Sequence, residues 1–186
     1  MRALAKRGFR ELYIVNPSAE NRDTGEFRVI SSCFPGGLSE TTQPFDVVVG
    51  QHRLEHSCAP VAAVAVARNL LAPNGEVWIE VPDIAASALS NGSVWLSIVY
   101  ALHSSYFTRE TLVRANAYAG PQALSIENVD HYGKSLRAVL SRGNEPSPAL
   151  ISANDEGHWD PVVDAMQRYF EGLKQFCAHV PSGIAC

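Results

Sequence analysis

The clearest pattern of hydrophobic and polar positions lies between residues 44 and 83. Residues 45–49 include three consecutive valines, and a short unbroken apolar run suits a strand buried on both faces, as in a parallel sheet. Residues 59–71 place apolar side chains at helical spacing after Pro60, and residues 76–81 alternate as a strand does. The turn residues at 73–75 separate the two. This stretch therefore predicts a strand, a crossover helix and a second parallel strand.

Weaker patterns on either side predict the remaining elements. A helix that begins at Thr108 has its apolar positions on one face until Gly120, where it ends. Beyond it, two alternating segments joined by a short turn predict an antiparallel hairpin. The other predictions are a helix at 1–7 closed by Gly8, strands at 11–15, 27–32, 123–129 and 135–140, a helical cover over the active site within 84–105, and a last helix from Asp160 with a broad apolar face.

Composition restricts the classes of ligand that fit. The chain has 186 residues, of which 46% are hydrophobic, so a single domain with a real core is expected. The formal net charge is −4 and no basic block is present, which argues against a nucleic acid or an anionic membrane as partner. The four cysteines lack paired spacing, and no apolar run is long enough for a signal peptide or a membrane span. We expect a cytoplasmic protein with reduced thiols and a small-molecule ligand.

Two stretches resemble a known family. The order FDVVVGQHRLEH, NLLAPNG and EVWIEVPD is similar to the second half of a class I S-adenosylmethionine-dependent methyltransferase. The stretch LHSSYFTRETLVRANAYAG, residues 102–120, resembles a segment of the small-molecule C- and O-methyltransferases. The resemblance implies an α/β fold, with a Rossmann-like sheet, helices on both faces and a C-terminal antiparallel hairpin. It also implies transfer of a methyl group from S-adenosylmethionine to a small molecule.

The resemblance also implies an incomplete domain. The family holds its cofactor mainly with a glycine-rich turn after the first strand, and the sequence contains no such turn. That strand lies in the middle of the sheet, so without it two half-sheets with unpaired edges are expected, to be completed by another chain or by a missing N-terminal segment. The expected organisation is a partial methyltransferase domain at 1–141, a linker at 142–160, and a C-terminal helix with the start of a truncated region at 161–186.

Carried over residue by residue, the resemblance implies cofactor contacts at the ends of three strands. Asn16 stands where the family has an acidic residue for the ribose hydroxyls, and Cys33 stands where an aspartate near the adenine is common. Asn accepts one hydrogen bond but is a weaker bidentate partner than a carboxylate. The full set of implied cofactor-binding residues is Asn16, Cys33, Phe34, Gly50 and Gln51.

The implied catalytic residues are histidines. His103 opens the stretch beside the substrate, where an imidazole can remove a proton from the methyl acceptor, and His52 lies at the mouth of the strand at 45–49. Methyl transfer needs little more than alignment of two reactants and exclusion of water. Glu55, Tyr106 and Phe107 are the implied residues of the substrate pocket. The other histidines, at positions 131, 158 and 179, receive no role.

Three alternatives remain open. His52, Glu55 and His56 also match the H-x-x-E-H pattern of a zinc peptidase, although that pattern needs both histidines on one helix and Cys58 to Pro60 interrupt any helix here. No metal site is therefore predicted. A second alternative is a non-catalytic methyltransferase-like remnant that serves as a binding module. A nicotinamide-dependent enzyme has no support, because a G-x-G-x-x-G turn is absent from the sequence.

Overall fold

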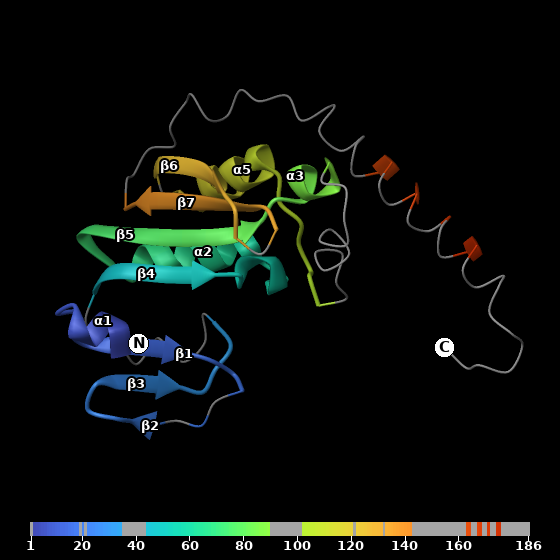
Figure 1. Ribbon diagram of the computed structural model, residues 1–186. Coiled ribbons are helices and arrows are strands. Elements are labelled where there is room, and N and C mark those ends of the chain that lie inside the picture. The colour runs from blue at the N-terminus through green and yellow to red at the C-terminus, as the bar shows by residue number, and fades with distance from the viewer. Residues whose placement is uncertain are drawn as a thin grey trace, which may run out of the picture.

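The computed structural model describes residues 2–18, 20, 22–34, 44–89, 102–120, 122–131 and 133–142, with seven positions between 163 and 175. The strands within these residues form two sheets, one of three strands and one of four, which lie side by side (Figure 1). Helices pack on the larger sheet, whose first two strands are parallel. The expected α/β class is confirmed.

The smaller sheet has the order β1-β3-β2. Strand β1 (Leu12–Val15) runs parallel to β3 (Phe27–Ile30), and β2 (Arg22–Asp23) pairs with β3 in the antiparallel sense. Helix α1 (Arg2–Lys6) precedes it, and Gly8 lies just after this helix with a φ of 90°, a backbone conformation that glycine adopts without strain. The predicted helix and both predicted strands are thus present, whereas β2 is too short to leave a pattern in the sequence.

The larger sheet has the order β4-β5-β7-β6, with β4 parallel to β5 and antiparallel pairing elsewhere. Strand β6 therefore runs in the same direction as β4 and β5, so the carboxyl ends of all three lie at one edge of the sheet. The predicted strand, helix, strand unit and the predicted hairpin are both confirmed. The bounds are Phe45–Gln51 for β4, Leu71–Pro82 for β5, Gln122–Val129 for β6 and Ser135–Ser141 for β7.

The hydrophobic core lies between this sheet and two helices, α2 (Pro60–Asn69) and α5 (Arg109–Ala119). Pro60 occupies the first turn of α2, where its missing N–H costs nothing. The alternating side chains of β5 and β7 that face the helices are buried, each fully buried aliphatic side chain contributing about 1.5–3 kcal/mol. They are Val77, Ile79, Val81, Leu136, Ala138 and Leu140, which pack with Ala63, Val64, Ala67, Leu112 and Ala115.

Hydrogen bonds at both ends fix the position of α5. The Thr108 hydroxyl accepts from the Thr111 N–H at 3.2 Å, and the Thr111 hydroxyl accepts from the Thr108 N–H at 2.8 Å, so the two threonines form a reciprocal cap. Gly120 ends the helix in the left-handed region at a φ of 88°. The predicted limits of this helix are confirmed, and they place residues 102–107 against the carboxyl edge of the sheet.

Asp83 connects the end of β5 to helix α3 (Ile84–Leu89). Its carboxylate accepts from the Ala86 N–H at 3.1 Å and from the Asn128 side-chain amide at 3.1 Å. Burial raises the pKa of Asp83, although these hydrogen bonds oppose the shift. Of the predicted helical cover at 84–105, residues 84–89 are helical in α3, residues 102–105 are not helical, and residues 90–101 lie outside the described part of the chain. Its role as a cover over the active site stays a prediction.

The predicted turn at 73–75 is instead an irregularity within β5. Strand pairing jumps from Leu71 opposite Phe45 to Glu76 opposite Val47. Gly75 lies in this irregularity, and a Cβ atom there would be 2.7 Å from the Phe45 carbonyl oxygen. Only glycine lets the two backbones approach so closely.

The two sheets do not join through backbone hydrogen bonds. Strand β1 is an edge of one sheet and β4 is an edge of the other, and no strand among the described residues pairs with either outer edge. Between them, the rings of Tyr13 and Phe45 meet edge to face at 5.3 Å. The expected pair of half-sheets with unpaired edges is therefore present.

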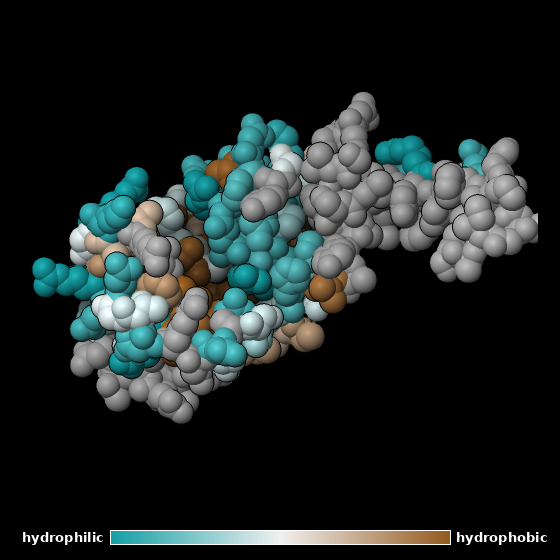
Figure 2. Space-filling model, turned by 60° about the horizontal axis from the view of Figure 1, so that its bottom comes forward, coloured by the Kyte–Doolittle hydropathy of each residue, from teal (hydrophilic) through white to brown (hydrophobic). Residues whose placement is uncertain are grey.

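One face of the larger sheet exposes apolar side chains. Val49 of β4 is 66% exposed and its partner Trp78 of β5 is 41% exposed, so the prediction that residues 45–49 are buried on both faces is wrong for this face. Seen from the side of the smaller sheet, apolar atoms lie in a recess between polar areas (Figure 2). Among the described residues, no helix has the length and hydropathy required to cross a membrane.

Seven positions of the expected C-terminal helix are described. The expected linker at 142–160 and most of the expected C-terminal segment lie outside the described residues, apart from Arg142. The described positions of the last segment, at 163–164, 167–168, 171 and 174–175, are helical.

Candidate active site

One row of directly opposed residues crosses the larger sheet close to its carboxyl edge. Gln51 of β4 lies opposite Glu80 of β5, Glu80 lies opposite Arg137 of β7, and Arg137 lies opposite Glu127 of β6. Residues in such a row project from the same face of the sheet, so strand register alone brings their side chains together. The edge at which they lie is the one where open α/β sheets bind ligands.

Glu80 is the centre of this row. Arg137 donates two hydrogen bonds to Glu80 Oε2, from Nη2 at 2.9 Å and from Nε at 3.1 Å. The other carboxylate oxygen, Oε1, faces Nδ1 of His131 and the side-chain amide of Gln51, which is 3.4 Å away. Burial by itself raises the pKa of Glu80, but the hydrogen bonds from His131, Arg137 and Gln51 outweigh it and lower the pKa to about 2. Glu80 is therefore a carboxylate at neutral pH although it is only 5% exposed.

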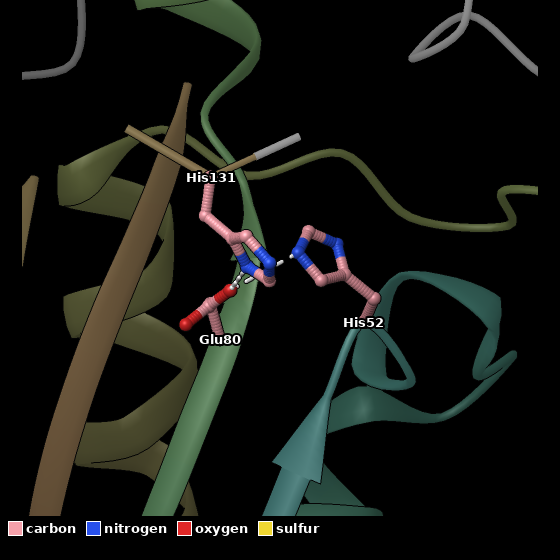
Figure 3. Close-up of side chains that lie close together, drawn as sticks. All are labelled: His52, Glu80 and His131. Atoms are coloured by element: carbon pink, nitrogen blue, oxygen red, sulfur yellow. Dashed lines mark hydrogen bonds and ion pairs between the residues drawn. The ribbon is translucent and has the colours of Figure 1, made fainter. Parts of the chain in front are cut away.

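His52 approaches the same oxygen from the end of β4 (Figure 3). Its Nε2 lies 3.2 Å from Glu80 Oε1, its Nδ1 lies 3.3 Å from Glu55 Oε1, and its backbone N–H donates to the Glu80 carbonyl. The backbone of His52 has a φ of 47°, a left-handed conformation that is uncommon outside glycine and often occurs at functional sites. Both ring nitrogens of His52 thus face a buried carboxylate.

His131 reaches Glu80 from the turn between β6 and β7, and its ring lies beside that of His52, with 5.6 Å between the ring centroids (Figure 3). Its carbonyl oxygen accepts from the Ser135 hydroxyl at 2.8 Å, and Lys134 pairs with Asp130 within the same turn. The His131 side chain is 39% exposed, compared with 19% for His52. His131 is therefore the imidazole of this cluster that solvent or a ligand reaches more easily.

A second group of histidines meets Glu55, which belongs to the short 3-10 helix η2 (Leu54–His56). One ligand atom each from Glu55, His56 and His103 lies within 4.8 Å of the others, and the same holds for His52, Glu80 and His131. Glu55 also contacts His52, so the two groups adjoin. Alternating imidazoles and carboxylates therefore extend from the β6–β7 turn to the segment before α5.

The expected cofactor-binding residues lie at or just after the carboxyl ends of their strands. Asn16 follows β1, Cys33 and Phe34 follow β3, and Gly50 and Gln51 end β4. Asn16 Oδ1 accepts from the Ser18 N–H at 3.0 Å, and Phe34 is 38% exposed. A Cβ atom at Gly50 would meet nothing within 4 Å. Cofactor binding by these residues stays a prediction.

The expected pocket residues separate into two environments. Tyr106 is half-buried, with its ring 6.3 Å from that of His103, as a pocket wall requires. Phe107 is 4% exposed and packs in the hydrophobic core, where its carbonyl accepts from the Ile84 N–H. Glu55 is also buried, at 2% exposed. The expected catalytic roles of His52 and His103 stay predictions, and the structure places these two residues in different groups.

Sequence reasoning did not single out Glu80, Arg137 or His131. Glu80 falls on the outward side of the alternation in β5, beside the exposed Trp78, so the pattern predicts a solvated side chain. Arg137 and His131 are ordinary strand and turn residues in the sequence. One feature of the sequence could have indicated His131, because the predicted hairpin places its turn, which carries this residue, at the carboxyl edge of the sheet.

The H-x-x-E-H pattern does not lie on one helix. His52 ends a strand in a left-handed conformation, and only Leu54–His56 form a short 3-10 helix. The two histidines accordingly approach Glu55 from different directions, at 3.3 Å for His52 Nδ1 and 4.0 Å for His56 Nε2. The geometry of a zinc peptidase helix is absent from this described stretch.

Comparisons with known proteins identify the family and the fold of the chain. Residues 1–126 match the family model described as a methyltransferase domain. No curated protein matches the chain. Among solved structures, a chain from the complex between the Haloferax volcanii Trm112 methyltransferase activator and a methyltransferase is similar, with a TM-score of 0.59 and 12% identity over 76% of both chains.

Two further structures share the fold. The 1,6-didemethyltoxoflavin-N1-methyltransferase of Burkholderia thailandensis, with bound 1,6-didemethyltoxoflavin and S-adenosylhomocysteine, has a TM-score of 0.55 and 17% identity over 76% of this chain and 65% of its own. A protein described as a hemolysin, from Streptococcus thermophilus, has a TM-score of 0.54 and 11% identity over 92% of this chain and 64% of its own. At such low identity the likeness shows the fold alone. The family match does not favour the peptidase or the non-catalytic remnant.

Proposed function

Since the chain belongs to the methyltransferase domain family, we propose that it transfers a methyl group from S-adenosylmethionine to a small molecule whose proton is taken by His131. The observation that carries the proposal is the Glu80 cluster. It combines a buried, ionised carboxylate with an accessible imidazole at the carboxyl edge of β4 and β5. An acceptor that loses a proton, such as a hydroxyl or an acidic C–H group, becomes a stronger nucleophile when such a group takes that proton.

The described residues fit the adenosine end of the cofactor. S-adenosylmethionine supplies a methyl group on a cationic sulfur. Asn16 uses its side-chain oxygen for the Ser18 N–H, so its amide NH₂ is the group that would donate to a ribose hydroxyl. Phe34 offers an exposed ring to a flat base, and Gly50 leaves open space at the end of β4.

His131 and Glu80 form a base with its orienting carboxylate. Because Nδ1 of His131 faces Glu80, the ring is held in one orientation, and Nε2 is the atom that receives the proton of an acceptor O–H, N–H, S–H or acidic C–H group. The charge that then develops on the imidazole is stabilised by the Glu80 carboxylate, whose pKa is lowered by hydrogen bonds from His131 itself, Arg137 and Gln51. Arg137 is therefore a positioning residue for this base.

His52 has a different part in the same site. Its two ring nitrogens lie against Glu80 and Glu55, so its proton transfers are confined to these two carboxylates. The cost of its left-handed backbone, on the order of 1–3 kcal/mol, is offset by these contacts. We assign His52 the role of holding Glu80 and the η2 segment in place.

A partner that completes the sheet is part of the proposal. The outer edges of β1 and β4 each present unpaired backbone groups, and a strand lying between them would pair with both. Such a strand, supplied by another chain or by a segment preceding Met1, would also cover part of the apolar surface of β4. The small-molecule acceptor is the second partner.

The test combines cofactor binding with transfer. Isothermal titration calorimetry should show S-adenosylhomocysteine binding to the chain once a further strand completes the sheet. Transfer of radiolabelled methyl to a panel of phenols, thiols, N-heterocycles and β-dicarbonyl compounds should then occur in one class. His131→Asn should lower kcat about 10²–10⁴-fold and leave S-adenosylhomocysteine affinity unchanged.

Glu127→Gln is the matched control, because Glu127 also contacts Arg137 but lies on the exposed end of the row. It should keep the wild-type kcat. Absence of S-adenosylhomocysteine binding would refute cofactor use, whereas normal kcat in His131→Asn would refute the assignment of the base.

A further inference from the structure

We propose that Glu55, His56 and His103 form a binding site for one divalent transition-metal ion of the zinc class. Two imidazoles and one carboxylate are the protein ligands of many zinc sites that keep a coordination position open. Glu55 is buried and His56 is exposed, so one ligand lies inside the protein and an ion can reach the site from solvent at His56. The proposal concerns ion binding only and is independent of the methyl-transfer proposal.

The ligand atoms lie close to the spacing that an ion requires. Two ligands about 2.0–2.1 Å from a tetrahedral ion are about 3.3 Å apart. His56 Nε2 lies 4.0 Å from Glu55 Oε1, and the rings of His56 and His103 meet at 4.8 Å between centroids. All three donor atoms lie within 4.8 Å of one another, so their separations need to shorten by about 1.5 Å or less to reach the spacing around a common ion.

The buried carboxylate of Glu55 points to a missing partner. Its Oε2 atom is fully buried and has no hydrogen-bond partner among the described residues, and none of their Lys or Arg side chains forms an ion pair with Glu55. A buried carboxylate oxygen without a partner is costly, because it has lost its hydration without compensation. A divalent cation held by both carboxylate oxygens would supply that compensation, because His52 and His56 contact only Oε1.

The orientation of the His56 ring suits metal binding. Its Nδ1 lies 2.9 Å from the carbonyl oxygen of Leu102 and donates to it, so in the neutral ring the lone pair is on Nε2, the nitrogen on the side of Glu55. Metal-ligating histidines commonly donate their other ring N–H to a backbone carbonyl in this way, which fixes the tautomer and the orientation of the ring.

The two segments that carry the ligands are already joined. The Ser105 N–H donates to the Glu55 carbonyl at 3.0 Å, and the Ser105 hydroxyl donates to the Ser57 carbonyl at 3.1 Å. These bonds tie η2 to the segment that leads into α5. The backbone conformation of the site is therefore already formed before an ion binds.

The neighbouring cluster of His52, Glu80 and His131 is the weaker candidate. Both Oε2 hydrogen bonds of Glu80 come from Arg137, and a guanidinium at 2.9 Å repels a cation. Glu80 Oε1 also accepts from His131 and Gln51. The carboxylate of that cluster is already satisfied, whereas Glu55 is not.

The test is a titration of the whole 186-residue chain with Co²⁺ after chelator treatment, followed by visible absorption. One ion per chain should bind with the intense bands of four- or five-coordinate Co²⁺, and Zn²⁺ should displace it. Glu55→Gln, His56→Asn and His103→Asn should each weaken binding at least tenfold. Circular dichroism of every variant establishes that the loss is not a loss of fold.

Two controls separate this site from its neighbours. His131→Asn removes a ligand of the other cluster, and Cys58→Ser removes a thiol that lies 3.8 Å from Ser104. Both should bind Co²⁺ with wild-type affinity. The proposal is overturned by absence of binding in the wild-type chain, by loss of binding in either control, or by wild-type affinity in His103→Asn.

Discussion

Arg137 and Glu80 are direct partners across two antiparallel strands, and the guanidinium donates two hydrogen bonds to one carboxylate oxygen. The pair lies at the centre of the row that begins with Gln51 and ends with Glu127. Strand register sets this contact. Glu80, held in this way, then contacts the candidate base His131. Four predictions follow from this pair and from the elements that support it.

Arg137→Met should raise the pKa of Glu80. The pKa is about 2 in the folded chain, where hydrogen bonds from His131, Arg137 and Gln51 outweigh burial. Methionine retains the apolar stem but removes two donors and a positive charge, so we expect the pKa to rise by about one unit or more. A ¹³C NMR titration of the Glu80 carboxyl measures the shift. Glu127→Gln should leave it unchanged, and an unaltered pKa in Arg137→Met would contradict the finding.

Glu80→Gln should destabilise the chain in a pH-dependent way. The folded pKa of about 2 lies below the ordinary value of 4.5 for a glutamate, so the ionised group stabilises the fold above about pH 4.5, and this contribution is lost as pH falls towards 2. At neutral pH we expect the variant to lose on the order of 2–3 kcal/mol of unfolding free energy. Urea denaturation at several pH values should show the gap between the two proteins closing below pH 4.5. A gap that stays constant down to pH 2 would refute this linkage.

Gly75→Ala should destabilise the strand irregularity in β5. The new Cβ would lie 2.7 Å from the Phe45 carbonyl and 3.1 Å from the Asp46 carbonyl, both of them backbone atoms that cannot turn aside. We expect a cost of about 1–3 kcal/mol in thermal or urea unfolding. Gly50→Ala is the control, since its Cβ would meet nothing within 4 Å, and it should change stability by about 0.5 kcal/mol or less. Equal stability of the two variants would contradict the close approach.

Thr108→Ala should weaken the start of α5. The variant loses the hydroxyl that accepts from the Thr111 N–H, at a buried position, and should cost about 1–2 kcal/mol. Thr108→Ser keeps the hydroxyl and should retain most of the stability. Hydrogen exchange at the first turn of α5 would locate the effect, and unchanged protection of the Thr111 amide in Thr108→Ala would be evidence against the cap.

The sequence by itself determined the elements and their order. The valines at 47–49, the segment after Pro60 and the cap at Thr108 act through local backbone preferences and periodicity, which need no distant partner. These local signals also located the hairpin, whose turn carries His131. The resemblance at residues 44–83 and 102–120 identified the family for the same reason, because its motifs are short and continuous.

Only the tertiary structure decided which side chains meet. The alternation in β5 predicts that Glu80 is exposed to solvent. It is only 5% exposed, because Gln51 of β4, Arg137 of β7 and His131 of the β6–β7 turn approach it. Its pKa follows from those contacts rather than from its sequence neighbours. Similarly, Glu55 meets His103 because hydrogen bonds of Ser105 and His56 tie two distant segments together. Register and long-range hydrogen bonds link residues far apart along the chain, and no local pattern in a single sequence records them.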